Sequence, residues 1–377
     1  MQTGSLKTPL LITRTGPLHQ LAERIAPEPI VAVDTESNSL YAYQEQVCLI
    51  QLSTSQEDFL VDPLELNDLS PLAPLFADPK IEKVFHAAEY DIVTMKRDFG
   101  FSFTNLFDTM LAARILGWDE MGLGAILKAE FDVELNKRYQ RANWGKRPLP
   151  EDMLDYARLD SHYLIPLRHR MKAELKASGR WPLALEDFRR LCHINGRDPD
   201  EAPVNCWRIS GSYDLSPEQA AVLQDLCLYR DQVARNINQP VFKVLGDRTL
   251  LAIAERMPRD WHQLEKVGEL SQKQMQRHGE SLLRSVARGL QAGPLRPPRS
   301  PRPDDQYLVR LDALRNWRKN TAQGMGVNSD VVLPRDLLQA IASLKQVDRP
   351  GLSAVLNQVP WRLEHFGEEI LNLLKRL

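Results

Sequence analysis

Residues 30–34, Ile-Val-Ala-Val-Asp, constrain the fold more than any other stretch of the chain. A short run of mostly β-branched apolar residues predicts a buried strand. The run ends in Asp34-Thr35-Glu36, and acids at positions i and i+2 of a strand point to the same side of the sheet. Carboxylates at the end of a buried strand are costly unless a cation compensates their charge. The stretch therefore predicts either a cation site or, more simply, a cap at the strand end.

Strands and helices alternate after this run. Residues 47–52 and 58–62 predict two further strands, so three strands in succession form an antiparallel meander. The pattern then changes to helix 68–77, strand 83–86, helix 87–99, strand 105–107 and helix 109–116. Asp108 is expected to cap the last of these helices and Gly117 to end it. This order predicts an α/β fold with a mixed sheet.

Length and composition limit the possible classes of protein. A chain of 377 residues is long enough for two or three domains, each with its own core. The net charge of −2 gives no sign of nucleic-acid binding over the whole chain, so any basic surface must be local. The four cysteines lack metal-ligand spacing and are expected to be free thiols, and no signal peptide or membrane span is evident. We expect a cytoplasmic protein.

Two more acids and a tyrosine fall on predicted helices. Asp91 follows strand 83–86 by about one turn, where the helix dipole alone could account for it. Asp160 lies four residues after Tyr156, so both share one helix face, and a hydrogen bond that pins the helix is the simpler explanation of that pair. Several carboxylates at one sheet edge are also what a pair of Mg²⁺ ions needs for in-line phosphoryl displacement.

The set Asp34-x-Glu36, Asp91 and Tyr156-x-x-x-Asp160 resembles the three motifs of the DEDD superfamily of 3′–5′ exonucleases, in its tyrosine-bearing branch. The surrounding stretches are similar to ribonuclease D, over about residues 15–205. They are VAVDTES, CLIQLST, VFHAAEYDI, NLFDTMLAARILG and YQRANWGKRPLPEDMLDYARLDSHYLIPL. This resemblance implies an RNase H-like exonuclease domain.

The resemblance also implies a role for each of the five residues. Asp34 would bridge two divalent ions, Mg²⁺ or Mn²⁺, and Glu36 and Asp160 would hold the ion that binds the attacking water. Asp91 would reach the second ion, and Tyr156 would orient the water. The implied reaction releases nucleoside 5′-monophosphates from the 3′ end of RNA such as tRNA precursors. The motifs alone suit a DNA exonuclease equally, and a non-catalytic nucleic-acid-binding module is a further alternative.

A basic segment precedes the helix that carries Tyr156. It is the best candidate for phosphate contacts, with Trp144 or Tyr139 available to stack on a base. A solvated loop with one packed tryptophan explains the segment equally well. The candidate nucleic-acid-binding residues are Lys137, Arg138, Arg141, Trp144, Lys146 and Arg147.

The second half of the chain contains one helical module twice. With an offset of 88 residues, Leu226-x-x-Tyr229-Arg230 falls on Leu314-x-x-Trp317-Arg318, and three further matches keep the same offset. The pattern resembles the HRDC domain of RecQ-type helicases and ribonuclease D. The expected domains are an exonuclease domain at 1–205, HRDC-like modules at 212–292 and 305–377, and a Pro/Arg linker at 293–304 between the modules.

The proline-rich linker predicts that the second module is separable. We expect a cut at Ser300 to leave the core of the remaining chain covered, and residues 1–292 to fold and stay active on short RNA. HRDC-like modules are implicated in nucleic-acid contact, although a scaffolding role fits the sequence nearly as well. A monomer is the expected state.

Overall fold

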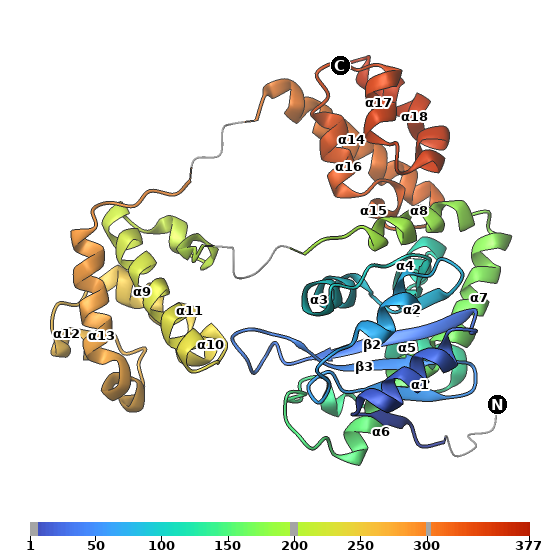
Figure 1. Ribbon diagram of the computed structural model, residues 1–377. Coiled ribbons are helices and arrows are strands. Elements are labelled where there is room, and N and C mark those ends of the chain that lie inside the picture. The colour runs from blue at the N-terminus through green and yellow to red at the C-terminus, as the bar shows by residue number, and fades with distance from the viewer. Residues whose placement is uncertain (1–6, 197–202, 299–302) are drawn as a thin grey trace. The chain divides into compact units, whose positions relative to one another are not determined.

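The computed structural model describes residues 7–196, 203–298 and 303–377 (Figure 1). Its contacts divide the chain into two units. One comprises residues 1–37, 47–196 and 302–377, and the other comprises residues 38–46 and 197–301. The predicted linker at 293–304 lies partly outside the described residues. Each unit is considered by itself.

A six-stranded mixed sheet forms the centre of the first unit. Its order is β1-β4-β3-β2-β5-β6, so β2 is a central strand. Strand β2 pairs antiparallel with β3 and parallel with β5, and β3 pairs antiparallel with β4. This is the predicted meander followed by parallel strands. The strands span Leu10–Ile12 (β1), Ile30–Ser37 (β2), Val47–Ser53 (β3), Asp58–Val61 (β4), Glu82–Phe85 (β5) and Leu106–Asp108 (β6).

Helices cover both faces of this sheet. Val31 and Val33 of β2 pack on one face with α1, α2 and α3, whereas Ala32 packs on the other with α4 and α7. This alternation is the period of two expected for a strand buried on both sides. The helices of the domain are α1 (Thr15–Ile25), α2 (Ala73–Ala77), α3 (Glu89–Phe99), α4 (Thr109–Leu116), α5 (Leu123–Phe131), α6 (Glu151–His162), α7 (Leu164–Ala177) and α8 (Trp181–Cys192).

Most of the predicted elements are present, and helices α1, α5 and α8 are additional to them. Asp108 accepts a hydrogen bond from the Leu111 N–H and caps α4, and Gly117 ends that helix in the left-handed conformation, as predicted. The sequence pattern missed β1, a three-residue edge strand in which Leu10 and Leu11 are more than 40% exposed. The helix predicted to carry Tyr156 and Asp160 is α6, and a separate helix, α7, follows it directly after Tyr163.

The predicted repeat is present as two bundles of five helices. The first contains α9 (Pro217–Asn236), α10 (Val241–Val244), α11 (Asp247–Arg256), α12 (Trp261–Glu265) and α13 (Gln272–Gln291). The second contains α14 (Asp305–Met325), α15 (Ser329–Val332), α16 (Arg335–Ala342), α17 (Arg349–Val355) and α18 (Pro360–Leu374). Each helix of the second copy begins 88 residues after its counterpart. One contact also repeats, since Arg230 donates to the Leu245 carbonyl and Arg318 donates to the Leu333 carbonyl.

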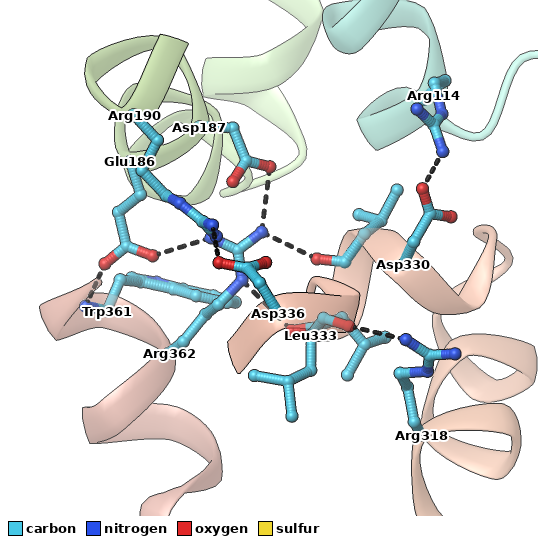
Figure 2. Close-up of polar contacts among 12 residues, drawn as sticks. Arg114, Glu186, Asp187, Arg190, Arg318, Asp330, Leu333, Asp336, Trp361 and Arg362 are labelled. Carbon is cyan, nitrogen blue, oxygen red and sulfur yellow. Dashed lines mark hydrogen bonds and ion pairs between the residues drawn. The ribbon is translucent and has the colours of Figure 1, made fainter. Parts of the chain in front are cut away.

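The second copy packs on α8 of the α/β domain, within the first unit (Figures 1 and 2). Arg362 of α18 is fully buried there and donates to Glu186 at 3.0 Å and to Asp187 at 2.9 Å. The same guanidinium donates to the carbonyls of Val331 and Val332. The backbone N–H of Trp361 also donates to Glu186. A buried arginine with this many acceptors is a fixed contact of the fold.

These contacts contradict the expectation that the second module can be removed without exposing the core. Val331 belongs to the same buried cluster as Phe107 and Phe188 of the α/β domain, and Trp361 packs against that cluster. Truncation before α14 would open that cluster to water and leave Glu186 without its partners. The linker composition showed only that the connection is extended, and carried no information about the surface on which the module packs.

Candidate active site

Strand β2 and helix α6 bring three of the predicted acids together. Carboxylate oxygens of Asp34, Glu36 and Asp160 all lie within 4.8 Å of one another. Asp34 and Glu36 lie two residues apart at the end of β2, and Asp160 is in the last turns of α6, which packs over β2 and β3. Three carboxylates within this distance are compatible with a hard divalent cation, which prefers oxygen ligands.

Asp91 reaches the site from the other face of the sheet. It is buried in the first turn of α3, and its carboxylate accepts a hydrogen bond from the Thr35 hydroxyl. Thr35 lies between the two acids of β2 and points to the face opposite theirs, toward α3. The sequence did not suggest a role for Thr35, although its place inside the Asp-x-Glu motif was the available signal.

Asp108 fixes the turn that leads into α3. Besides capping α4, its carboxylate accepts hydrogen bonds from the backbone N–H groups of Ala87 and Ala88. Ala87 has a φ of +62°, a left-handed conformation that is unfavourable for alanine and is held by these bonds. Asp108 therefore positions the start of α3 in addition to capping α4, which is the role predicted for it. The His86 ring lies 2.9 Å from the Thr109 hydroxyl. His86 does not belong to the group of possible metal ligands formed by Asp34, Glu36 and Asp160.

Tyr156 is held on the same side of α6 as Asp160. Its ring lies 5.8 Å from the ring of Tyr139 and 6.1 Å from that of Trp144, between centroids, and only 8% of the residue is exposed. Besides burial, the nearby Asp160 carboxylate helps to raise the pKa of the Tyr156 phenol. This proximity fits a role of Tyr156 in pinning the helix, and it equally places the hydroxyl at the acidic cluster.

Burial and mutual repulsion disfavour ionisation of the clustered acids. Burial raises the pKa of Glu36 to about 9, with the charges of Asp160 and Asp91 adding to the effect. Burial also raises the pKa values of Asp91 and Asp160 to about 7 each, and that of Asp34 well above its usual range. The pKa of Tyr156 is raised by burial and by the nearby acids, so its phenol stays protonated at neutral pH. Four acids in such a cluster, with Asp91 buried and the other three half-buried, carry an electrostatic cost that a bound cation would remove.

The candidate residues of the predicted basic segment differ in how far they are exposed to solvent. Trp144 is 1% exposed and packs with Tyr156 and Met153, which leaves no face for a base. Arg147 forms an ion pair with the buried Asp62 at 2.5 Å and donates to the Cys48 carbonyl. Both residues therefore support the fold, which matches the alternative of a loop with one packed tryptophan. Lys137, Arg138, Arg141 and Lys146 are exposed.

Comparisons with known proteins agree with this arrangement. A family model described as 3′-5′ exonuclease matches residues 11–176, and the HRDC domain model matches residues 219–286 and 308–374. Ribonuclease D of Pseudomonas paraeruginosa is 30% identical over 92% of this chain and 93% of the relative. The structure of Escherichia coli RNase D, an exoribonuclease involved in structured RNA processing, superposes with a TM-score of 0.70 at 27% identity, covering 98% of this chain and 99% of the other.

Some relatives are much longer than this chain. Exosome complex component 10 of Mus musculus is 38% identical over 66% of this chain, but the match spans only 29% of that protein.

Among the described residues of this chain, no helix combines the length and the apolar character that a membrane span requires.

Proposed function

Because the chain belongs to the ribonuclease D family, we propose that it is a 3′–5′ exoribonuclease that hydrolyses RNA with the help of divalent metal ions. The observation that carries the proposal is the convergence of Asp34, Glu36 and Asp160 within 4.8 Å. Tyr156 beside them and Asp91 beneath them complete the family's set of five residues.

The acidic cluster fits a metal site on its own chemistry. Its donors are all carboxylate oxygens. Burial raises the pKa values of Glu36 and Asp160, and repulsion from Asp160 and Asp91 raises that of Glu36 further. Asp34, Glu36 and Asp160 would hold one ion, and Asp34 with Asp91 a second. Two Mg²⁺ or Mn²⁺ ions would supply positive charge to the phosphate and increase the acidity of the attacking water.

The protein's own residues orient the reactants. The protonated Tyr156 hydroxyl holds the attacking water in line with the terminal phosphodiester bond. Attack of the water oxygen on phosphorus breaks the bond to the 3′ oxygen of the preceding nucleotide. That oxygen takes up a proton, so the products are a shortened RNA with a 3′ hydroxyl and a nucleoside 5′-monophosphate. The Thr35 hydroxyl keeps Asp91 in place throughout.

The exposed basic residues before α6 are proposed to contact the RNA backbone. Lys137, Arg138, Arg141 and Lys146 lie in the segment that leads into the helix of Tyr156 and Asp160. Such contacts position the substrate and make its binding sensitive to salt, without selecting a base. Structured RNA precursors with extra 3′ residues are the proposed substrates, and a cytoplasmic location remains a prediction.

Degradation of end-labelled RNA tests the proposal. With Mg²⁺, 5′-labelled RNA should give a ladder of shortening products, and 3′-labelled RNA should release labelled mononucleotide at once. EDTA or Asp34→Asn should stop both. A matched DNA oligomer separates the alternatives, because faster cleavage of DNA would favour a DNA exonuclease. Binding of RNA without cleavage of either substrate would favour the non-catalytic module.

A further inference from the structure

Gln51 of β3 is a buried polar residue without a partner in the described structure. Its exposed fraction is 0%, and neither the nitrogen nor the oxygen of its side-chain amide has a hydrogen-bond partner there. Leaving a buried amide unpaired is costly, and native proteins rarely do so without a reason. An apolar side chain of similar size would avoid that cost, so the amide needs an explanation in function.

The strand register places Gln51 directly opposite Asp34. The two residues are paired in the antiparallel ladder of β2 and β3, so their side chains lie on the same face of the sheet. The neighbours of Gln51 on that face are Leu49 and Ser53. Leu49 packs with Tyr156 and Ala157 of α6, and the Ser53 hydroxyl lies 2.7 Å from the Ser161 hydroxyl of α6. Gln51 thus lies beneath α6, next to a member of the acidic cluster.

We propose that Gln51 is a positioning residue of the metal site, whose side-chain amide donates a hydrogen bond to the Asp34 carboxylate when the cluster holds a divalent cation. The inference rests on the metal site of the proposed function and extends it to a residue outside the family's five. A carboxylate that binds a cation through one oxygen keeps acceptor capacity for an N–H donor, and such a bond fixes its orientation. The amide is neutral, so it fixes Asp34 without competing with the cation for its negative charge.

Replacement by leucine separates this role from a purely structural one. In Gln51→Leu, Mn²⁺ affinity measured by calorimetry should fall about tenfold, a typical loss for such a partner of a metal ligand. The metal-free variant should melt at or above the wild-type temperature, because an unpaired buried amide has been removed. Ser53→Ala is the matched control on the same strand face. This variant loses the hydrogen bond between Ser53 and Ser161 of α6. The melting temperature of the variant should therefore fall, while its Mn²⁺ affinity should stay at the wild-type value.

Three outcomes would count against the inference in different ways. Wild-type Mn²⁺ affinity in Gln51→Leu, with a lowered melting temperature without metal, would show that the amide has an internal structural partner. Should the leucine variant fail to fold, Gln51→Met provides the same comparison with an unbranched side chain, and wild-type affinity in that variant has the same meaning. A wild-type protein that binds no Mn²⁺ would overturn the metal site itself, and this inference with it.

Discussion

Replacing Arg362 by methionine should destabilise the packing of the second helical module on the exonuclease domain. The guanidinium is fully buried and donates to Glu186, Asp187 and two backbone carbonyls (Figure 2). Methionine keeps a long apolar stem but removes every one of these donors. Glu186, itself 2% exposed, would keep only the N–H of Trp361 as a partner.

The expected loss is about 3–5 kcal/mol, the usual cost of breaking a buried ion pair by removing one partner. Burial already raises the pKa of Glu186, against the lowering effects of the Trp361 N–H and the Arg362 guanidinium. Removing Arg362 raises that pKa further. A carboxyl with a raised pKa in the folded state stabilises the fold relatively more at low pH, so the defect should shrink as pH falls from about 8 to about 5.

Hydrogen exchange of α8 and α18 measures the opening of this interface directly. Arg362→Met should accelerate exchange in both helices, and adding Glu186→Gln should restore part of the protection because the more deeply buried of the two unpaired carboxylates is then neutral. Arg349→Met is the control, since the Arg349–Glu368 pair lies on the surface of the same module with both side chains 67% exposed. Its effect should stay within ~0.5 kcal/mol. Equal exchange in the wild type and Arg362→Met would refute the reasoning.

Three further predictions concern the acidic cluster and the modules. Asp34→Asn and Asp160→Asn should each abolish most turnover, while in metal-free melts they should be as stable as the wild type or more so, because repulsion among buried acids is reduced. The pKa of Glu36 is raised from 4.5 to about 9, so the folded state binds this proton more tightly. Metal-free melting temperatures should therefore fall as pH rises between those values, and saturating Mn²⁺ should flatten the slope. A protein ending at residue 292 should aggregate or melt below the full chain, as light scattering and melting curves would show.

The sequence predicted the parts of the structure that depend on local patterns. Residue types predicted the alternation of strands and helices and the cap at Asp108. The constant offset of 88 residues predicted the spacing of the two modules. The family motifs also identified the acids that the fold brings together at Asp34, Glu36 and Asp160. Local patterns suffice here because Asp34 and Glu36 lie near the end of a predicted strand and Asp160 lies on a predicted helix.

Contacts between distant elements could not be predicted in the same way. Trp144 and Arg147 were candidate nucleic-acid-binding residues because their segment is basic, and only the structure shows that Trp144 is buried and that Arg147 pairs with Asp62. A comparison of the two repeat copies did contain one sign that the second module packs on another surface. Arg362, Trp361 and Val331 stand where the first copy has Gln274, Lys273 and Lys243, so an apolar and ion-pairing surface replaces a polar one.

We propose that Tyr156 acts on the attacking water and does not only pin α6. Tyr156→Phe removes one oxygen and leaves the ring, which packs with Tyr139 and Trp144. The decisive measurement is single-turnover cleavage of a short RNA under saturating Mg²⁺, with a melting curve of each protein. If the hydroxyl orients the water, the rate should fall by roughly two orders of magnitude with little change in stability or Mg²⁺ dependence. An unchanged rate with a loss of about 1 kcal/mol of stability, the worth of one hydrogen bond, would contradict this role.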